Sequence, residues 1–340
     1  MLRKFVLAKA CEERGQGLVL AAFAMVVILG FAAIAIDVGL FLQERRDLQK
    51  SADAAALAGA QELPASPGDA QQKAEEWAAK NGIDAGEIDS VDITSTYAAN
   101  DTITVEVKRD VPFVFARVLG FTSDTMSAEG TARVGSPAAM GGLAPFAVLE
   151  DAIELDEPTV LKYDAHEASH GNFGALAIDG NGASTYRETI KYGSETALCS
   201  ESPTCPDPTT ETEPGNMTGP TRQGVNWLID ETSTACDEFD EVFQEHGDTY
   251  WLKTRCNPFG PGGAHDSKRV VIVPVIEELC HGRCDVTILK FAMFFLEELG
   301  SCTGNDCEVT GWFMDAQADV GSLMGALEPD SLIHFVRLVE

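Results

Sequence analysis

The chain has 340 residues, of which 45% are apolar and 23% charged, so it can bury a core and is not a disordered acidic tail. Its formal net charge is −30, from 54 acidic against 24 basic residues. A phosphate-binding surface needs a concentrated basic patch, and the sequence has none, so we expect no nucleic-acid partner.

The first predicted element is an uncharged apolar run from Leu18 to Ile36. Its nineteen residues make a helix of about 28 Å, close to the ~30 Å hydrocarbon core of a bilayer. We therefore predict a single membrane-spanning helix. A cleaved signal peptide is the alternative, although the run exceeds the usual ~7–15 apolar residues. Asp37 follows the run and is expected to mark the outer boundary of the membrane or to pair with a base of a neighbouring subunit.

The cysteines predict the orientation of this helix better than the basic residues, which lie on both sides of it. Cys11 precedes the apolar run, and the other eight cysteines lie far beyond it. An even set of this kind suggests disulfides in an oxidising compartment. We therefore expect a single-pass protein of the cell membrane, with a cytoplasmic N-terminus and residues 43–340 outside the cytoplasm. The eight candidates are Cys199, Cys205, Cys236, Cys256, Cys280, Cys284, Cys302 and Cys307.

The helix is predicted to continue beyond the membrane through an alanine-rich stretch that ends before Pro64. Small side chains let a second element approach closely. We expect these positions either to pack laterally on partner helices, giving a homo- or hetero-oligomer, or to pack on the chain's own ectodomain. The positions are Ala52, Ala55, Ala56 and Gly59.

Three strings along this region carry a family resemblance: Arg14-Gly15-Gln16-Gly17, Ala35-Ile36-Asp37-Val38-Gly39 and the stretch from Leu48 to Ala60. Over residues 14–61 the chain resembles TadG-like (TadE/TadG-type) proteins of the bacterial tight-adherence (Tad, Flp pilus) assembly systems. Residues 171–176, 213–220 and 269–274 resemble, more loosely, ectodomains attached to such anchors. The resemblance implies an envelope protein of pilus biogenesis that binds pilus-system proteins or pilin subunits, with no cofactor and no catalysis.

Beyond the long helix we expect an α+β fold. Residues 64–135 are predicted to form a small α+β unit, in which alternating polar and apolar residues indicate strands. Its expected elements are a helix over 69–80, strands over 91–97 and 102–107, a helix over 111–121 and a strand over 126–134.

From residue 136 the expected strands are short and the loops rich in Gly, Pro and Thr, which predicts a mostly β, disulfide-stapled domain. Its strand candidates are 146–149, 159–163, 175–178, 270–275, 286–295 and 333–339, with little regular structure over 200–220. The expected organisation is a cytoplasmic N-terminus (1–16), the transmembrane helix and its extension (17–63), the small α+β unit (64–135) and the Cys-rich extracytoplasmic domain (136–340).

Two motifs suggest metal chemistry. His166-Glu167-Ala168-Ser169-His170 matches the His-Glu-x-x-His pattern, in which two histidines bind zinc and the glutamate acts as general base. That chemistry needs a helix, and Gly171-Asn172 would end one at once. Asp179-Gly180-Asn181-Gly182 spaces oxygen ligands as a calcium loop does, and we interpret it as a turn. The close spacing of Cys280 and Cys284 also leaves a zinc alternative to disulfides open.

The leading hypothesis is a membrane-anchored structural protein of Flp pilus assembly that acts by docking of its helix and ectodomain. The alternatives are a membrane-anchored zinc hydrolase built on His166, Glu167 and His170, and a surface adhesin.

Overall fold

The structure is a computed structural model that describes residues 16–155, 157–162, 174–201, 205–247, 249–259, 267–280, 282–303, 306–318, 323–325 and 331–339. The helices are α1 (Gln16–Ala60), α2 (Pro67–Lys80), α3 (Ala183–Tyr192), α4 (Thr218–Asp230) and α5 (Phe239–Val242), with 3-10 turns η1 (Ala85–Glu87), η2 (Ala116–Leu119), η3 (Glu150–Ala152) and η4 (Thr254–Cys256). The strands are β1 (Ile88–Thr94), β2 (Thr102–Pro112), β3 (Ser123–Gly135), β4 (Pro137–Met140), β5 (Val148–Leu149), β6 (Pro158–Lys162), β7 (Leu198–Cys199), β8 (Thr209–Glu211), β9 (Phe243–His246), β10 (Thr249–Leu252), β11 (Val270–Ile276), β12 (Asp285–Thr303), β13 (Asp306–Met314), β14 (Ala316–Gln317), β15 (Leu323–Met324) and β16 (Ile333–Leu338).

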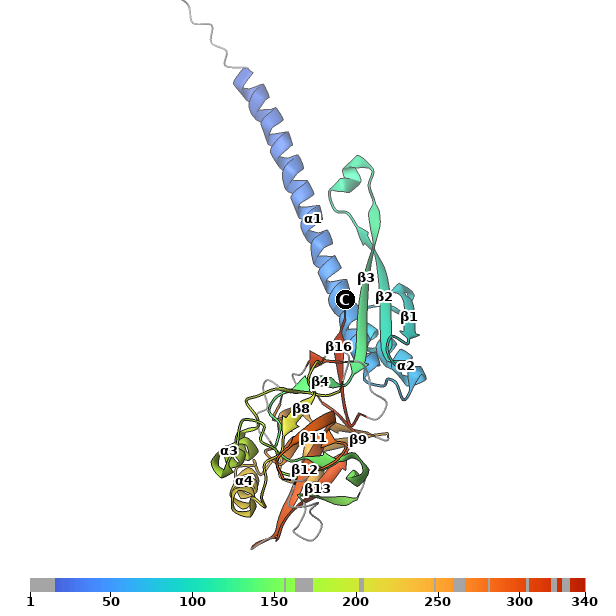
Figure 1. Ribbon diagram of the computed structural model, residues 1–340. Coiled ribbons are helices and arrows are strands. Elements are labelled where there is room, and N and C mark those ends of the chain that lie inside the picture. The colour runs from blue at the N-terminus through green and yellow to red at the C-terminus, as the bar shows by residue number, and fades with distance from the viewer. Residues whose placement is uncertain are drawn as a thin grey trace, which may run out of the picture.

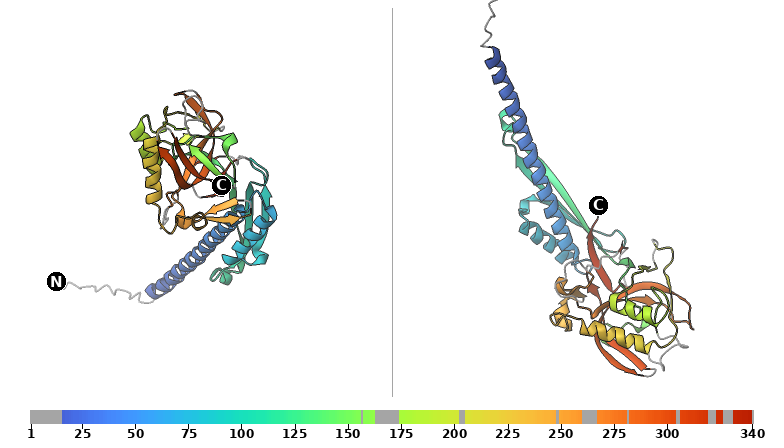
Figure 2. Two further views of the ribbon diagram at one scale, coloured as in Figure 1. Left: turned by 90° about the horizontal axis from the view of Figure 1, so that it is seen from below. Right: turned by 90° about the vertical axis from the view of Figure 1, so that its left-hand side faces the viewer.

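The long helix α1 projects from the rest of the molecule (Figures 1 and 2). Its 45 residues make it about 68 Å long. Within the described residues it is the one helix long and apolar enough to cross a membrane. The apolar side chains from Leu18 to Ile36 are exposed, whereas Leu48 and most of the alanines after it in α1 are buried. The same helix is therefore lipid-compatible in its first half and part of a protein core in its second half.

A membrane-proximal unit forms where the second half of α1 packs on α2 and on the antiparallel strands β1, β2 and β3. Its core combines small residues of the two helices with Ile103, Val105 and Val107 of β2. The predicted helix over 69–80 and the three predicted strands are confirmed, with small shifts at their ends.

The helix expected over 111–121 is wrong. Pro112 ends strand β2, Phe113 to Thr122 form the tip of the β2–β3 hairpin, and this tip contains the short turn η2. Gly120 adopts φ +97°, which ends the turn in the left-handed region. The apolar run was long enough for a helix, but strand pairing on both sides makes it a hairpin tip.

The C-terminal strand joins the two parts of the molecule. Strand β16 pairs antiparallel with β3 and parallel with β14. In the described part of the chain it thereby completes a seven-stranded sheet of order β1-β2-β3-β16-β14-β10-β9, which runs from the membrane-proximal unit into the distal part (Figure 1).

The distal β domain is built around a second sheet, of order β5-β11-β12-β13-β6 with β8 added to β12, as far as the structure describes it. Alternate residues of β11 enter two different cores: Ile272 lies with Phe243, and Val273 lies with helices α3 and α4. Both faces of the strand are covered, which explains its uninterrupted apolar sequence. The expected α+β fold, with a long anchor helix and a mostly β domain, is thus confirmed.

One expectation for the distal part needs correction. The segment over 175–178 makes isolated bridges through Ala175 and Leu176 rather than a strand. The described residues of the loop over 200–220 have little regular structure, as expected, apart from β8, which pairs with β12, and the start of α4. The other expected strands are present, at 146–149 only as the short β5.

Candidate functional site

The small residues of α1 face the chain's own sheet and helix α2. Ala52, Ala55 and Ala56 are fully buried within the chain. A Cβ on Gly130 of β3 would lie 2.5 Å from the carbonyl carbon of Ala52, so that glycine allows the strand to touch the helix backbone. Of the two packing modes expected for these positions, the structure has the internal one, and they offer no surface to a partner helix.

Gly59 allows a second close approach near the end of α1. A Cβ there would lie 2.7 Å from the side chain of Ile103, 2.8 Å from the carbonyl oxygen of Ala70 and 3.0 Å from Ala74. The helix is thus seated between a strand and α2 with little space between them. Such packing holds the helix in one position because interiors of this density have few alternative arrangements.

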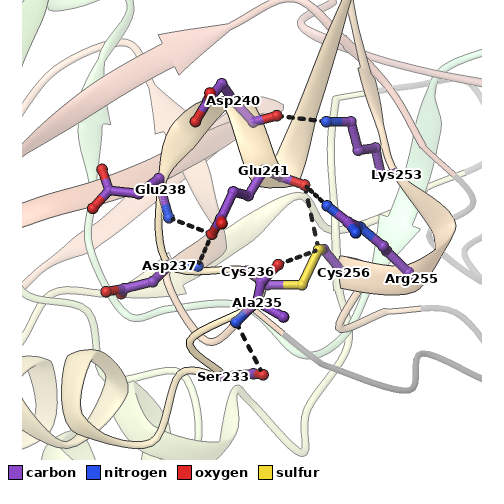
Figure 3. Close-up of a disulfide and its surroundings, with 10 residues drawn as sticks. All are labelled: Ser233, Ala235, Cys236, Asp237, Glu238, Asp240, Glu241, Lys253, Arg255 and Cys256. Atoms are coloured by element: carbon purple, nitrogen blue, oxygen red, sulfur yellow. Dashed lines mark hydrogen bonds between the residues drawn. A yellow bond between two sulfur atoms is a disulfide. The ribbon is translucent and has the colours of Figure 1, made fainter.

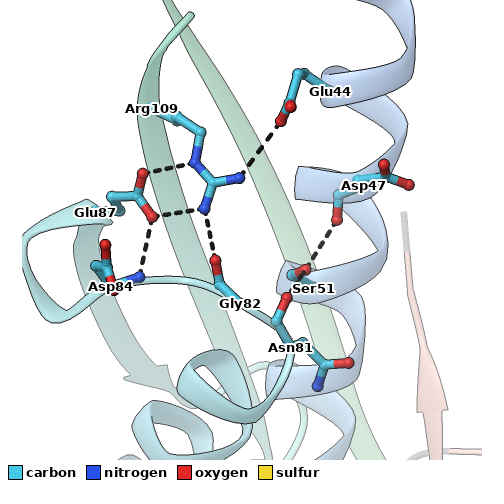
Figure 4. A network of polar contacts seen from close by, with 8 residues as sticks. All are labelled: Glu44, Asp47, Ser51, Asn81, Gly82, Asp84, Glu87 and Arg109. Carbon is cyan, nitrogen blue, oxygen red and sulfur yellow. Dashed lines mark hydrogen bonds and ion pairs between the residues drawn. The ribbon is translucent and has the colours of Figure 1, made fainter.

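A polar network at the surface also connects α1 to β2 and to the loop after α2 (Figure 4). The guanidinium of Arg109, on β2, donates to Glu87 at 2.6 and 2.7 Å, to the carbonyl of Gly82 at 2.6 Å and to Glu44 of α1 at 3.4 Å. The hydrogen bond from Arg109 lowers the pKa of Glu87, and that pair raises the pKa of Arg109. On α1, the hydroxyl of Ser51 lies 3.0 Å from the carbonyl of Asn81. One arginine therefore links α1, β2 and the loop after α2.

Asp37, at the end of the apolar run, binds the tip of the hairpin. Its buried carboxylate accepts the backbone N–H groups of Val114 at 2.9 Å, Phe115 at 3.0 Å and Ala116 at 2.7 Å. From the sequence, Asp37 was expected to mark the membrane boundary or to pair with a base of another subunit. Neither expectation included this contact with the hairpin tip. The one available signal was a carboxylate beside a long apolar run, which needs a hydrogen-bonding partner.

The opposite end of β2 carries a similar cap. Asp101 accepts the N–H groups of Thr96 at 2.7 Å, Tyr97 at 2.9 Å and Ala98 at 3.0 Å, all within five residues of it. Burial would raise the pKa of Asp101, but these hydrogen bonds outweigh it and the pKa is lowered. The carboxylate stabilises the β1–β2 turn.

The Asp179 segment is a turn whose carboxylate binds helix α3 and the loop that follows it. Asp179 accepts the N–H groups of Thr196 at 2.8 Å and Glu195 at 3.1 Å and the hydroxyl of Thr189 at 3.1 Å. Its oxygens are thereby used within the protein. In the part of the chain that the structure describes, no group of three or more His, Cys, Asp or Glu side chains is placed to hold a metal ion. His166, Glu167 and His170 lie outside the described residues.

The eight candidate cysteines lie in four pairs at disulfide distance within the described residues: Cys199–Cys205, Cys236–Cys256, Cys280–Cys284 and Cys302–Cys307. Figure 3 shows the pair with the longest loop, which joins the segment before α5 to η4. Around it, Arg255 donates to the carbonyl of Glu241 at 3.2 Å, and the carboxylate of Glu241 accepts the N–H of Asp237. All four pairs lie in the distal domain.

Two protein families match the chain in the region just described. Residues 15–62 match the family "Putative Flp pilus-assembly TadE/G-like", and residues 58–132 match the family "Putative Tad-like Flp pilus-assembly". Over residues 15–132, about a third of its length, the chain is TadG-like. The expected resemblance over residues 14–61 is thus confirmed and extends to the end of the β2–β3 hairpin. No curated protein and no solved structure matches the chain.

The two matched ranges coincide closely with the membrane-proximal unit and its helix α1. Together they contain α1, α2, the hairpin and its tip, so the helix and the sheet that packs on it correspond to the Tad families. With the apolar helix, they identify a membrane-anchored pilus-assembly protein.

Proposed function

We propose that this TadG-like protein assists Flp pilus assembly by docking, without catalysis: α1 holds it in the cytoplasmic membrane and the ectodomain contacts pilin subunits or other pilus-system proteins. The observation that carries the proposal is the continuity of α1, which runs unbroken from the apolar segment into the core of the membrane-proximal unit. An anchor followed by a flexible linker would tether the ectodomain without orienting it, whereas a shared helix transmits its orientation.

The packing around α1 supports this rigid transmission. Gly130 and Gly59 bring strand and helix backbones into contact, and Arg109 adds hydrogen bonds between α1 and β2. Strand β16 then extends the same sheet into the distal domain. A partner that binds the distal domain is thereby held at a defined position relative to the membrane.

The cysteine pairs support the proposed orientation, and the exposure of α1 supports the proposed partner surface. Disulfides persist in oxidising compartments, so the four cysteine pairs favour an ectodomain outside the cytoplasm and an N-terminus inside it. Because Ala52, Ala55, Ala56 and Gly59 are used internally, a partner helix would contact the exposed half of α1, before Glu44.

The proposal is tested by deleting the gene in its host and counting surface filaments by negative-stain electron microscopy. We expect few or stunted filaments, restored by the wild-type gene and equally by the His166→Ala copy. Restoration by the wild type but not by His166→Ala would instead favour the zinc hydrolase. Normal filaments in the deletion strain would reject an assembly role and leave the adhesin.

Docking itself is tested with a photo-crosslinking amino acid placed at Ile28, on the exposed half of α1, and at Tyr97, an exposed position in the β1–β2 turn, as the control. A crosslink to the major pilin from position 28 alone, detected with an antibody against that pilin, would support contact through the exposed half. Equal yields from both positions would contradict it.

A further inference from the structure

The tip of the β2–β3 hairpin, Phe113–Thr122, lies beside α1 and points back toward the N-terminal end of that helix (Figures 1 and 2). Asp37 holds the tip through three backbone N–H groups. The ring of Phe113 also stacks on Phe41 of α1, with centroids 6.0 Å apart. The tip is therefore attached to the helix at the level of Asp37.

The position of Asp37 along α1 sets the depth of the tip in a bilayer. From Gly17 to Ile36 the helix rises about 30 Å, which equals the thickness of the hydrocarbon core. Asp37 then lies at the edge of the core on the ectodomain side. A groove of about 630 Å³ between helix and tip is lined by Ala33 and Gly30 of α1 and by Val118 of the tip. These helix residues lie one to two turns on the membrane side of Asp37, or roughly 6–10 Å deeper.

Most exposed side chains of the tip are apolar and suit that depth, and the exposed Arg117 has a stem long enough to extend its charged group to the headgroups. Val118 is 88% exposed and Phe121 63% exposed, and Val114 and Phe115 are exposed as well. They continue the exposed apolar surface of α1 around Ile34 and Val38. Large apolar side chains gathered at one place on a surface mark an interaction site, and this one is continuous with a membrane-spanning segment.

Most backbone N–H groups of the tip have hydrogen-bond partners within the protein, as an apolar environment requires. An unpaired N–H group is costly in lipid, where no water replaces the missing partner. Val114, Phe115 and Ala116 donate to Asp37, and Phe113 donates to Thr122. Within the turn, the acceptors are again backbone carbonyls: Val118 donates to Phe115, Gly120 to Arg117 and Phe121 to Ala116.

We propose that this tip inserts into the ectodomain-side leaflet as a second membrane contact beside α1, with phospholipid acyl chains filling the groove between them. Lipid is the occupant because the exposed tip and the exposed half of α1 form one apolar surface at bilayer depth. Two carboxylates line the groove: that of Asp37 accepts N–H groups of the tip, and that of Asp124, in β3, accepts the N–H of Thr125. A second contact beside the helix restricts the tilt of the ectodomain relative to the membrane plane more than a single helix does.

The test uses the full chain in vesicles of phosphatidylcholine and phosphatidylglycerol, with a tryptophan introduced by Val118→Trp and acyl chains brominated near the headgroup. We expect the added emission to be blue-shifted and largely lost with the brominated lipid, and unaffected by aqueous iodide. The matched control is Tyr97→Trp, an exposed position at the opposite end of β2, where iodide and not brominated lipid is expected to quench. Phe121→Trp is a second reporter that keeps an aromatic ring in the tip.

Two results would overturn the proposal. Quenching of the Val118→Trp and Phe121→Trp emission by iodide would place the tip in water. Protection from both iodide and brominated lipid would mean that a protein partner covers it. Adding Asp37→Ala to the Val118→Trp chain is expected to abolish lipid quenching, because the tip loses its attachment to α1. Unchanged quenching would overturn the role of Asp37 in positioning the tip.

Discussion

The membrane-proximal unit and the distal β domain pack in different ways. In the membrane-proximal unit α1, α2 and the sheet meet through alanine and glycine, and the strand β3 touches the helix backbone at Gly130. In the distal domain the core contains large residues such as Phe291, Phe294 and Phe313, and four cysteine pairs lie around it.

The difference in packing reflects the elements that each part must keep in place. A helix that leaves the membrane can be fixed against a sheet when small side chains let the backbones approach, and the close fit leaves little freedom. The distal domain consists of short strands with long connections, so large apolar side chains and covalent links restrict it. Strand β16, which pairs with β3, is the element through which a change in one part reaches the other.

The largest expected effect comes from truncating one core residue in each part. Phe294→Ala in β12 is expected to cost about 3–5 kcal/mol of unfolding free energy, and Ile103→Ala in β2 about 2–5 kcal/mol, because each leaves a cavity in a fully buried site. Hydrogen exchange of the full chain in detergent should show lost protection in the distal domain for Phe294→Ala and around α1 for Ile103→Ala. Equal loss in both parts for either change would show that they unfold as one unit.

Removing a cysteine pair should affect the distal domain alone. Replacing Cys236 and Cys256 by alanine opens a loop with a sequence separation of 20 and is expected to cost about 3 kcal/mol. The matched control replaces Cys280 and Cys284, with a separation of 4, and should cost less, about 2 kcal/mol. Urea unfolding followed by circular dichroism measures both. A larger cost for the short loop would contradict the loop-length argument, and reduced protection of α1 would contradict the separation of the two parts.

A single methyl group should disturb the membrane-proximal unit. Gly130→Ala is expected to cost about 1–3 kcal/mol, since the new Cβ would meet the backbone of Ala52, which cannot rotate away. Gly86→Ala is the matched control, because its Cβ would point into open space. The two variants are compared by thermal unfolding in the same detergent. Equal melting temperatures would mean that α1 and β3 are packed less tightly than the structure indicates.

The smallest expected effect concerns the polar network and its pH dependence. Arg109→Met should cost about 1 kcal/mol at neutral pH, since it removes the hydrogen bonds to Glu87. The pKa of Glu87 is lowered from 4.5 in the folded protein, so its contribution is present above about pH 4.5 and is lost as the pH falls below it.

The measurement is urea unfolding between neutral pH and about pH 3. The wild type should lose stability on acidification more steeply than Arg109→Met. Lys80→Met, which breaks a solvent-exposed helix pair with Glu76, is the control and should change little. Parallel curves for the wild type and Arg109→Met would show that the Arg109–Glu87 pair does not stabilise the fold.

Local patterns predicted much of this architecture. The apolar run gave α1, the alternating residues gave β1 to β3, and eight cysteines beyond a membrane anchor gave a disulfide-stapled domain. The pairing of these cysteines did not follow, because eight cysteines allow 105 connectivities. The small residues of α1 indicated close packing but not which surface they meet.

Asp101 and Asp37 show which hydrogen-bond partners can be predicted from the sequence and which cannot. Each accepts three successive N–H groups, and both carboxylates are buried. The donors to Asp101 lie three to five residues away, so the turn before β2 could be predicted locally. The donors to Asp37 lie 77 to 79 residues away.

The sequence by itself determined the elements whose signals are local: the apolar helix, the β1–β2 turn and the strands of the hairpin. The tertiary structure alone decided that 111–121 is a hairpin tip, that Ala52 faces Gly130 and that Asp37 binds the tip. The physical reason is that period and composition report which side chains a segment must bury or solvate, whereas the partner that satisfies them is chosen only when distant segments pack together.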